Sequence, residues 1–436
     1  MKIKCSISLV ILMNLFYAQV ILGQVWRPLD QGLNNTVFAM CVDSQNNQLY
    51  VGGHFTKAGS IKVQNLSIWD GNTWLNAPDM QDQVNALIYF KGHIYVALDN
   101  GWVGYIQDND FVIAGTFDNY VSCFALYKDT LYAGGHFTTA YGFFGEDDRE
   151  VNHIARFDSI GRWVSLGKGV TGPIDPEVEA MHEYNGDLVA GGFFNMAGDS
   201  AVKNIARWDG TNWRPMKKGL YDPDNEYSAY VDAMDTFQGK LVVGGEFHQA
   251  GSIPCHSLAT WSGESWDTLE YVVTNSVRTI YSSFGNLYVS GIIDDGLSAW
   301  NGVNWYQLNW GGAGDIFSFR TFQGHIYAGG GFYQLKDSLN EIAYLDYATS
   351  AGSIVSDESF LLFPNPVSGK LIINYNISQP AQLLLSDPYG RTLKSFTISP
   401  ASKNEVIDVH NLASGMYLVA LQSAGKRISQ RVMVVR

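Results

Sequence analysis

The sequence predicts an all-β protein, a seven-bladed β-propeller followed by a small antiparallel β-sandwich. One phrase, Leu/Ile–x–Val/Ala–Gly–Gly–x–Phe, recurs along the chain, and self-similarity at a period of roughly 40–50 residues is typical of propellers and other repeat folds. Its copies are Leu49–Phe55, Leu131–Phe137, Leu188–Phe194, Leu241–Phe247 and Ile326–Phe332. The aromatic content of 14% also favours strands over helices.

A second phrase, Trp–x–Gly–x–x–Trp, follows most copies of the first. It spans residues 69–74, 208–213, 261–266 and 300–305. The Asp-Gly, Ser-Gly and Asn-Gly pairs inside it are typical of two-residue hairpin turns, which need positive φ. Each repeat therefore reads as four short antiparallel strands, which is the blade of a propeller.

The predicted first strands give the number of units. They begin at Val37, Val84, Val121, Val178, Val231, Val277 and Ile316, which indicates seven. In the second unit Val96-Ala97-Leu98 replaces the Gly-Gly phrase, and residues 104–112 carry the outer hairpin.

The seventh unit lacks its fourth strand, because no Trp strand follows residues 342–346. At the other end of the chain, Val25–Leu33 has the same form as Trp163–Val170 and Trp213–Leu220. We therefore expect the N-terminal strand to complete the last blade and close the ring, which leaves no open sheet edge.

The repeated residues have structural explanations. The paired glycines permit close approach of neighbouring blades or a β-bulge, and the tryptophans pack between blades. The repeats, over residues 25–347, resemble those of exported bacterial β-propellers and of the fungal cortical polarity-marker propeller. This resemblance implies the fold and names no ligand.

The N-terminus has the form of a secretory signal. Lys2 and Lys4 precede an apolar run over residues 7–16, and Gly23 precedes the expected cleavage point. The predicted organisation is a signal peptide over 1–23, a propeller over 24–348, a linker over 349–359 and a C-terminal domain over 360–436. The mature chain is expected to hold no transmembrane segment, and its odd count of three cysteines leaves at least one thiol unpaired.

Charge divides the mature chain in two. Residues 24–359 hold 18 basic and 39 acidic residues, whereas residues 360–436 hold 8 basic and 3 acidic ones. This change marks a domain boundary. Because the large domain has no basic stripe, nucleic acid is excluded as its partner.

The long connections between blades are the predicted binding face, because variable loops on a rigid scaffold usually carry function. This face is acidic through residues Glu146, Asp147, Asp148, Asp222, Asp224 and Glu226. Oxygen-rich loops suit calcium, but no segment has the full calcium-loop pattern, so calcium, a basic partner and a plain solvated rim all remain open. No cofactor and no other metal is predicted.

The residue after the leading aliphatic of each first strand is expected to approach the propeller axis. There Glu179 and Asp232 lie on adjacent blades, and paired carboxylates are what glycoside hydrolysis needs. They are therefore the candidate catalytic residues. The alternative is a hydrogen-bonded channel lining in which Arg278 balances their charge.

The last 77 residues alternate as a small antiparallel sandwich and closely resemble the type A C-terminal sorting domain of type IX secretion. The residues that carry this resemblance are Phe363, Pro364, Asn365, Pro366, Gly369, Gly390, Arg391, Gly415 and Tyr417. The resemblance implies export across the outer membrane of a Gram-negative bacterium. It also implies the type IX machinery and a sortase-like peptidase as partners, with the chain then released or held at the cell surface.

These observations favour a secreted or cell-surface binding and adhesion propeller whose ligand is a glycan, a surface polymer or a protein. A secreted polysaccharide hydrolase or lyase with its site at the axis is the first alternative. A structural surface-layer protein is the second.

Overall fold

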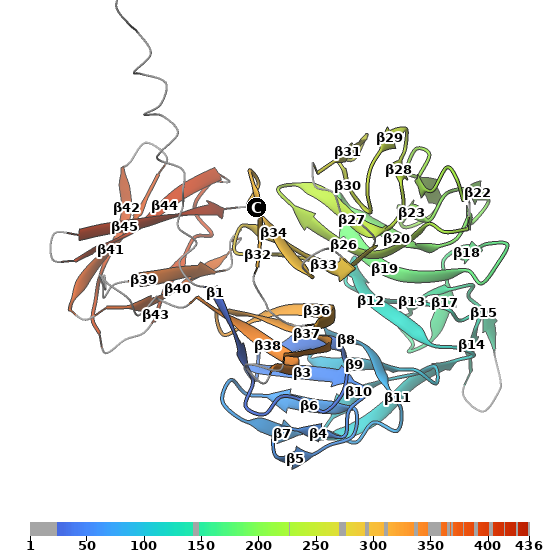
Figure 1. Cartoon of the computed structure of the whole chain (residues 1–436), viewed down its shortest axis with the longest axis horizontal. Helices are drawn as coiled ribbons and strands as arrows, with labels where there is room; N and C mark the ends of the chain where they lie inside the picture. Colours follow the sequence, from blue (N-terminus) through green and yellow to red (C-terminus); the bar gives the residue numbers. More distant parts are fainter. Residues whose placement is uncertain are drawn as a thin grey trace, which may run out of the picture.

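The computed structural model describes residues 24–142, 148–225, 227–269, 276–292, 296–308, 313–334, 339–347, 359–363, 367, 369–377, 379–387, 391–400, 404–413, 415–423 and 426–434. All regular elements in these residues are β-strands, so the all-β prediction is confirmed (Figure 1). The predicted signal peptide and residues 349–358 of the predicted linker lie outside the described part.

Four repeats form four-stranded antiparallel sheets in which each strand pairs with the next along the chain. The first holds β2 (Val37–Asp43), β3 (Gln48–Gly53), β6 (Leu66–Trp69) and β7 (Trp74–Asn76). Another holds β12 (Val121–Tyr127), β13 (Thr130–Gly135), β16 (Ile154–Phe157) and β17 (Trp163–Ser165). The next two hold β19 (Glu177–Tyr184), β20 (Asp187–Phe193), β23 (Ile205–Trp208) and β24 (Trp213–Pro215), then β26 (Tyr230–Phe237), β27 (Lys240–Glu246), β30 (Leu258–Trp261) and β31 (Trp266–Thr268).

Three further repeats follow the same pattern with local changes. The worn second repeat holds β8 (Val84–Phe90), β9 (His93–Leu98), β10 (Trp102–Gln107) and β11 (Asp110–Phe117), extended by β14 (Thr139–Tyr141) and β15 (Arg149–Glu150). The sixth holds β32 (Ser276–Ser283), β33 (Asn286–Ile292), β34 (Leu297–Trp300) and β35 (Trp305–Gln307). The last holds β36 (Ala313–Phe322), β37 (His325–Gln334), β38 (Leu339–Tyr347) and β1 (Gln24–Pro28).

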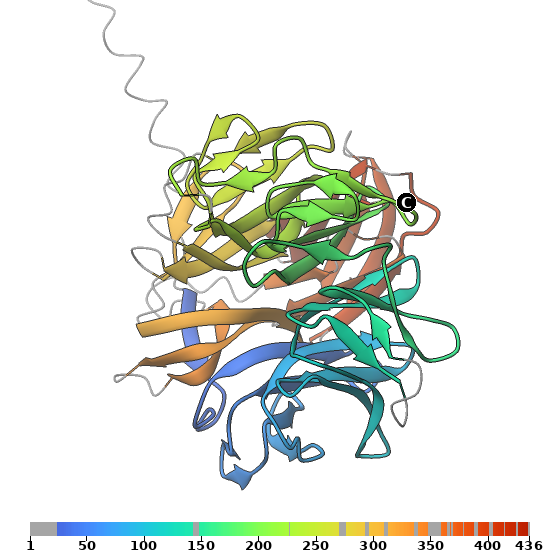
Figure 2. The ribbon, with the colours of Figure 1, turned by 90° about the vertical axis from the view of Figure 1, so that its right-hand side faces the viewer.

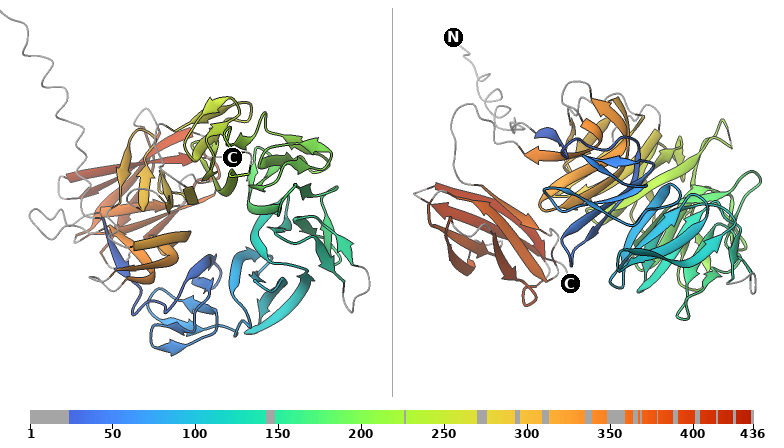
Figure 3. Two further views of the ribbon diagram at one scale, coloured as in Figure 1. Left: turned by 45° about the vertical axis from the view of Figure 1, so that its right-hand side comes forward. Right: turned by 90° about the horizontal axis from the view of Figure 1, so that it is seen from below.

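The first strands of these sheets pack against one another in chain order. The order is β2, β8, β12, β19, β26, β32 and β36, and β36 packs back against β2. Figure 2 and the left view of Figure 3 show the sheets following one another around a common axis. Met40 of β2 donates its backbone N–H to Ser318 Oγ of β36 at 3.2 Å, which joins the two ends of this order.

Strand β1 takes the outer position in the last sheet, where it pairs antiparallel with β38 from Gln24↔Tyr347 to Pro28↔Ala343. The segment after β1 repeats a contact made elsewhere. Trp213 Nε1 and Trp266 Nε1 each donate to a carbonyl of the preceding sheet, Leu166 O and Met216 O, at 2.9 Å. Trp74 Nε1 donates in the same way to Leu29 O at 3.4 Å. The N-terminal segment therefore makes the contacts of an outer strand.

The two glycines of the repeated phrase have different roles. A Cβ on Gly191 would overlap the Val231 methyl of the next sheet, whereas a Cβ on Gly192 would overlap the Glu177 carbonyl of its own sheet. The first glycine therefore permits close packing of neighbouring sheets, and the second permits the backbone to bulge. Further first-role glycines are Gly52, Gly134, Gly244 and Gly329, and further second-role glycines are Gly53, Gly135, Gly245 and Gly330.

Short extra strands order the long connections on one face. They are β4 (Lys57–Ala58) with β5 (Ile61–Lys62), β18 (Val170–Thr171) with β21 (Met196–Ala197) and β22 (Ser200–Ala201), and β25 (Leu220–Tyr221) with β28 (Gln249–Ala250) and β29 (Ile253–Pro254). The pairs β18–β21 and β25–β28 join segments of adjacent repeats, whereas β4 and β5 pair within one connection, so these long connections have ordered backbones.

The C-terminal region forms two antiparallel sheets around one apolar core. One sheet holds β39 (Ser359–Phe363), β40 (Lys370–Asn376) and β43 (Asn404–Asp408). The other holds β41 (Ala381–Ser386), β42 (Thr392–Ile398), β44 (Gly415–Ser423) and β45 (Lys426–Val434). Cys41, Cys123 and Cys255 are free thiols. Among the described residues there is no helix of the length and apolarity that a membrane crossing requires.

Candidate functional site

Each first strand carries a β-bulge at the same place, opposite the glycine pair or, in the second and sixth repeats, opposite Ala97-Leu98 and Ser290-Gly291. In β19 the pairing with β20 steps from Val178↔Gly192 to Ala180↔Gly191, so Glu179 has no partner across the ladder. A bulge re-aims the side chain of the extra residue. The residues at this position are Phe38, Asn85, Ser122, Glu179, Asp232, Arg278 and Phe317.

All seven bulge residues line one open cavity of about 370 Å³, which we call the axial cavity. Gln83, Asp99 and Tyr120 complete its lining. The bulges lie at the start of the first strands and face the ends of the second strands, so the axial cavity belongs to the same face as the long connections. The two candidate catalytic residues, Glu179 and Asp232, are brought together there.

The two carboxyls have different surroundings. Burial, together with nearby Glu177 and Asp232, raises the pKa of Glu179 to about 8, and the hydroxyl of Ser122, which donates to Glu179 Oε1 at 3.1 Å, opposes the rise. Burial also raises the pKa of Asp232, to about 6, against the attraction of Arg278, whose guanidinium donates to Asp232 Oδ2 at 3.0 Å. At neutral pH the first carboxyl is therefore mainly protonated and the second mainly ionised.

Polar and aromatic groups continue the lining on the other side. Gln83 Nε2 donates to Asn85 Oδ1 at 2.7 Å, and Asn85 Nδ2 donates to Asp99 Oδ1 at 3.0 Å. The rings of Phe38 and Phe317 lie side by side with centroids 5.5 Å apart. Neither phenylalanine was predicted from the sequence to be a site residue, although both occupy the same repeat position as Glu179.

This arrangement suits an uncharged ligand rich in hydroxyl groups. It presents hydrogen-bond donors and acceptors beside an aromatic surface, the combination that small-molecule sites use. Within the described ranges, no three or more His, Cys, Asp or Glu side chains gather in a way that could hold a metal ion.

The acidic residues predicted on the long connections are not among the described residues that line the axial cavity, and Asp148 and Asp222 accept hydrogen bonds from neighbouring loop residues. Asp222 Oδ1 accepts the backbone N–H of Asp224 at 2.9 Å, and Asp222 Oδ2 accepts Ser228 Oγ at 2.9 Å and contacts His248 Nδ1 at 3.1 Å. Asp148 Oδ1 accepts the Gly142 N–H at 3.0 Å. These carboxylates hold their own loops. Glu146, Asp147 and Glu226 lie outside the described residues.

Some sorting-motif residues have clear structural roles. Asp387 Oδ1 accepts the backbone N–H of Arg391 at 2.9 Å and its Oδ2 accepts Arg391 Nε at 3.1 Å, which closes the turn between β41 and β42. Tyr417 donates its hydroxyl to Ala413 O at 2.9 Å, and Gly369 O accepts the Val409 N–H at 2.8 Å.

The remaining motif residues are placed only in part. Phe363 ends β39, and Gly415 begins β44. Pro364, Asn365, Pro366 and Gly390 lie outside the described residues.

Comparison with known proteins identifies the C-terminal region. Residues 361–435 match the family model of the secretion system C-terminal sorting domain, which marks the chain for export. No curated protein matches the chain at a significant level.

Several solved structures are similar in part. PorZ, described as an essential bacterial surface component of the type-IX secretion system of Porphyromonas gingivalis, is 14% identical with a TM-score of 0.46 over 92% of this chain and 60% of PorZ. The chain thus spans about 60% of that protein's length. The designed Ika8 protein is 13% identical with a TM-score of 0.45, over 74% of this chain and 99% of Ika8. The WD40 propeller domain of Doa1 is 13% identical with a TM-score of 0.39, over 63% and 80% of the two chains.

Proposed function

We propose that this chain is a seven-bladed propeller, closed by β1, that is exported by type IX secretion and binds a glycan in the axial cavity. The closed ring is supported by the packing of β36 against β2 and by the pairing of β1 with β38. Export is supported by the sorting-domain match over residues 361–435.

The observation that carries the binding function is the variety of the bulge residues. The glycine pair opposite them recurs in five of the seven sheets, yet the bulge position holds two aromatic, two acidic, one basic and two uncharged polar side chains. Packing does not require this variety, because all seven side chains face the open axial cavity. A polyhydroxyl ligand uses every one of these groups as hydrogen-bond partner or apolar surface.

Binding is tested with the full chain on an array of neutral and acidic glycans, followed by titration of each hit. Phe38→Ala combined with Ser122→Ala should weaken axial binding at least about tenfold, since it removes one aromatic surface and one hydroxyl. The matched control is Leu126→Ala, an exposed side chain on the Ser122 strand but away from the axial cavity. Unchanged affinity in the double variant would overturn the proposed site.

A second candidate function rests on the separated pKa values of Glu179 and Asp232. A mainly protonated carboxyl beside a mainly ionised one is the pairing that glycoside hydrolysis uses for general acid and base. In this reading Glu179 protonates the leaving oxygen, and Asp232 activates water or attacks the sugar. Polysaccharide cleavage by the wild-type chain that Glu179→Gln abolishes, with glycan affinity kept, would establish the enzyme. Absence of cleavage across the substrates that bind would leave binding as the function.

The export step is tested separately. A periplasmic reporter fused to residues 349–436 should appear outside the cell, and the same reporter without the tail should stay in the periplasm. The fused reporter should also appear in the periplasm when the type IX machinery is removed. A fusion that remains inside an intact host would contradict the proposed route.

A further inference from the structure

A second cavity lies on the rim of the long-connection face, between the fourth and fifth repeats. It measures about 410 Å³ and is lined by Ala201, Val202, Lys203, Lys217, Lys218 and Tyr221. Lys203 stands in the connection before β23, and the other two lysines lie between β24 and β25. Two separate connections thus bring three lysines to one cavity, which we call the lysine cavity.

These lysines stand out against the charge of their domain. Residues 24–359 carry 39 acidic and 18 basic side chains, yet none of the three ammonium groups forms an ion pair with a described carboxylate. By contrast, Lys168 pairs with Asp199 and Lys240 with Asp267 at comparable exposed positions. All three lysines are exposed, so their charge is available to a ligand.

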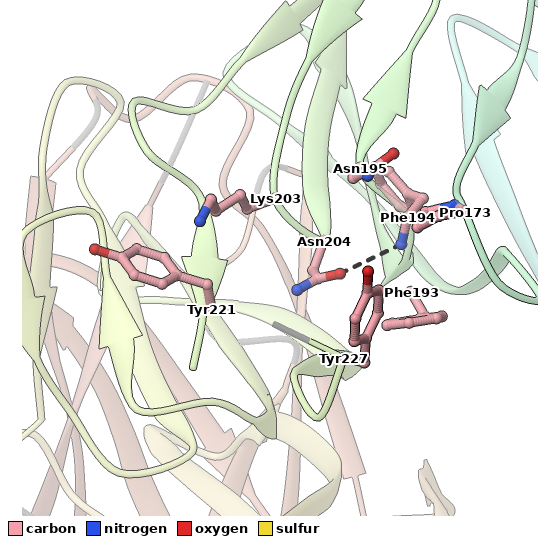
Figure 4. A pocket seen from close by; sticks show the side chains of 8 residues that line it. All are labelled: Pro173, Phe193, Phe194, Asn195, Lys203, Asn204, Tyr221 and Tyr227. Atoms are coloured by element: carbon pink, nitrogen blue, oxygen red, sulfur yellow. Dashed lines mark hydrogen bonds between the residues drawn. The ribbon is translucent and has the colours of Figure 1, made fainter. Parts of the chain in front are cut away.

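Lys203 is held in place by an aromatic ring. Its Nζ lies 4.2 Å from the centroid of the Tyr221 ring, a cation–π contact. Figure 4 shows Lys203 and Tyr221 side by side, with Tyr227 near Phe193 at the other end of the same region. The contact fixes the position of the ammonium group without neutralising its charge.

An aromatic slot adjoins the lysine cavity and shares Lys203 and Tyr221 with it. Its other lining residues include Pro173, Phe193 and Tyr227, and Tyr227 is 54% exposed. An exposed aromatic ring next to fixed cations offers a flat apolar surface beside an ammonium group that can pair with an acid group.

We propose that the lysine cavity and the aromatic slot together form a rim subsite for an acidic saccharide. The carboxylate or sulfate of one sugar lies among Lys203, Lys217 and Lys218, and the apolar face of a neighbouring sugar ring packs on Tyr227. This subsite is distinct from the axial cavity, and the proposal goes beyond glycan binding there.

The distribution of charge on this face limits the class of ligand that the rim subsite can bind. The axial cavity on the same face carries Glu179 and Asp232, and screening confines the influence of the lysines to about 8 Å at physiological ionic strength. A polyanion much longer than the subsite would be repelled over the rest of this face. The subsite therefore fits a short acidic saccharide, or the acidic end of a longer one.

The test titrates the full chain with tetragalacturonate, its fully methyl-esterified form and a sulfated heparin-derived tetrasaccharide, each at low and high salt. We expect at least one acidic tetrasaccharide to bind about tenfold more tightly than the uncharged ester at low salt, and this gain to fall at high salt. Lys217→Ala with Lys218→Ala should remove the gain.

The matched control is Lys57→Ala with Lys62→Ala. These two exposed lysines lie between β3 and β6, in the first repeat's counterpart of the connection that carries Lys203, and their replacement removes the same charge from the same face. The control should keep the gain within about twofold. Tyr227→Ala should weaken the acidic tetrasaccharide and the uncharged ester alike, because it removes apolar surface.

The outcomes separate the two proposals. If neither acidic tetrasaccharide binds more tightly than the ester, or if both lysine pairs lower affinity equally, the rim subsite is wrong. Loss of binding in the Phe38 and Ser122 variant reports on the axial cavity alone. The axial site therefore stands or falls independently of the rim.

Discussion

Two regions of the repeat lie next to each other and differ in how much their sequence varies. One is the contact between neighbouring sheets, which we call the seam, and the other is the set of bulge residues that face the axis. Gly191 belongs to the seam, where an added Cβ would overlap a methyl of the next sheet, and Gly192 beside it lies against a carbonyl of its own sheet, opposite the bulge. Glu179, across the ladder from them, faces the open axial cavity. The residue type at the seam recurs because the short distance between neighbouring sheets leaves little room for a side chain. The residue type at the bulge position varies because these side chains face an open cavity and no neighbouring sheet packs against them.

The largest effect should come from removing the seam that joins the two ends of the propeller. Deleting Gln24–Gly32 removes β1 with the buried side chains of Trp26 and Leu29. Loss of one buried large side chain alone costs about 3–5 kcal/mol, so the midpoint of thermal unfolding should fall by about 10 °C or more. Differential scanning calorimetry measures this fall.

Arg27→Ala is the control for that deletion. Arg27 lies on the same strand, but its ion pair with Asp346 is exposed and should be worth no more than about 1 kcal/mol. An unchanged melting temperature after the deletion would refute closure by β1.

Next in size is a single methyl group placed on the glycine opposite the bulge. Gly192→Ala drives a Cβ into the Glu177 carbonyl, and overpacking of this kind costs about 3 kcal/mol. Gly186→Ala is the comparison, because its Cβ would meet no atom within 4 Å, and only its φ of +81° opposes the change, at about 1 kcal/mol. Denaturant unfolding should rank the two variants in that order. Equal losses would mean that the contact with the Glu177 carbonyl does not select the glycine.

A smaller, pH-dependent effect should appear at the axis. The pKa of Glu179 is about 8 in the folded chain against 4.5 for the unperturbed carboxyl, so the folded state holds the extra proton between these values. Wild-type stability attributable to this group therefore falls as pH rises from about 4.5 to 8 and is constant above that range.

Glu179→Gln should accordingly gain melting temperature relative to wild type between pH 5 and pH 9. The control, Glu183→Gln, changes an exposed carboxyl on the same strand and should show no such trend. A difference between Glu179→Gln and wild type that is independent of pH would contradict the raised pKa.

The smallest effect should follow a neutral change at the axis. Asn85→Ala removes the contacts with Gln83 and Asp99 and should cost at most about 1 kcal/mol, since water can replace them in the open cavity. Chemical denaturation measures this. A loss as large as that of Gly192→Ala would erase the distinction between the packed glycine pair and the open axis.

Much of the scaffold could be predicted because its signals are local. The expected strand starts at Val37, Val84 and Val121 coincide with β2, β8 and β12, and the start expected at Val178 lies one residue inside β19. Turn dipeptides and paired glycines report on their own strand, so one copy of the repeat explains the others.

The axial cavity was only partly foreseeable. Glu179 and Asp232 attracted notice as carboxylates, whereas Phe38 and Phe317 resembled ordinary strand residues. What unites the seven positions is a register shift between two strands, which is a property of their pairing. The rim lysines depend on two connections meeting in space, and no spacing in the sequence encodes that meeting.

Because β1 pairs with β38, the last sheet can form only when the chain is nearly complete. Arg27 and Asp346 are separated by 319 positions, so the strand that leaves the membrane first finds its partner only after nearly the whole repeat region has followed. Contacts of such long range form late and slowly. A chain cut anywhere before β38 would expose two unpaired strand edges, which proteases and chaperones recognise. Export of intact chains and removal of broken ones would then depend on the same five residue pairs between β1 and β38.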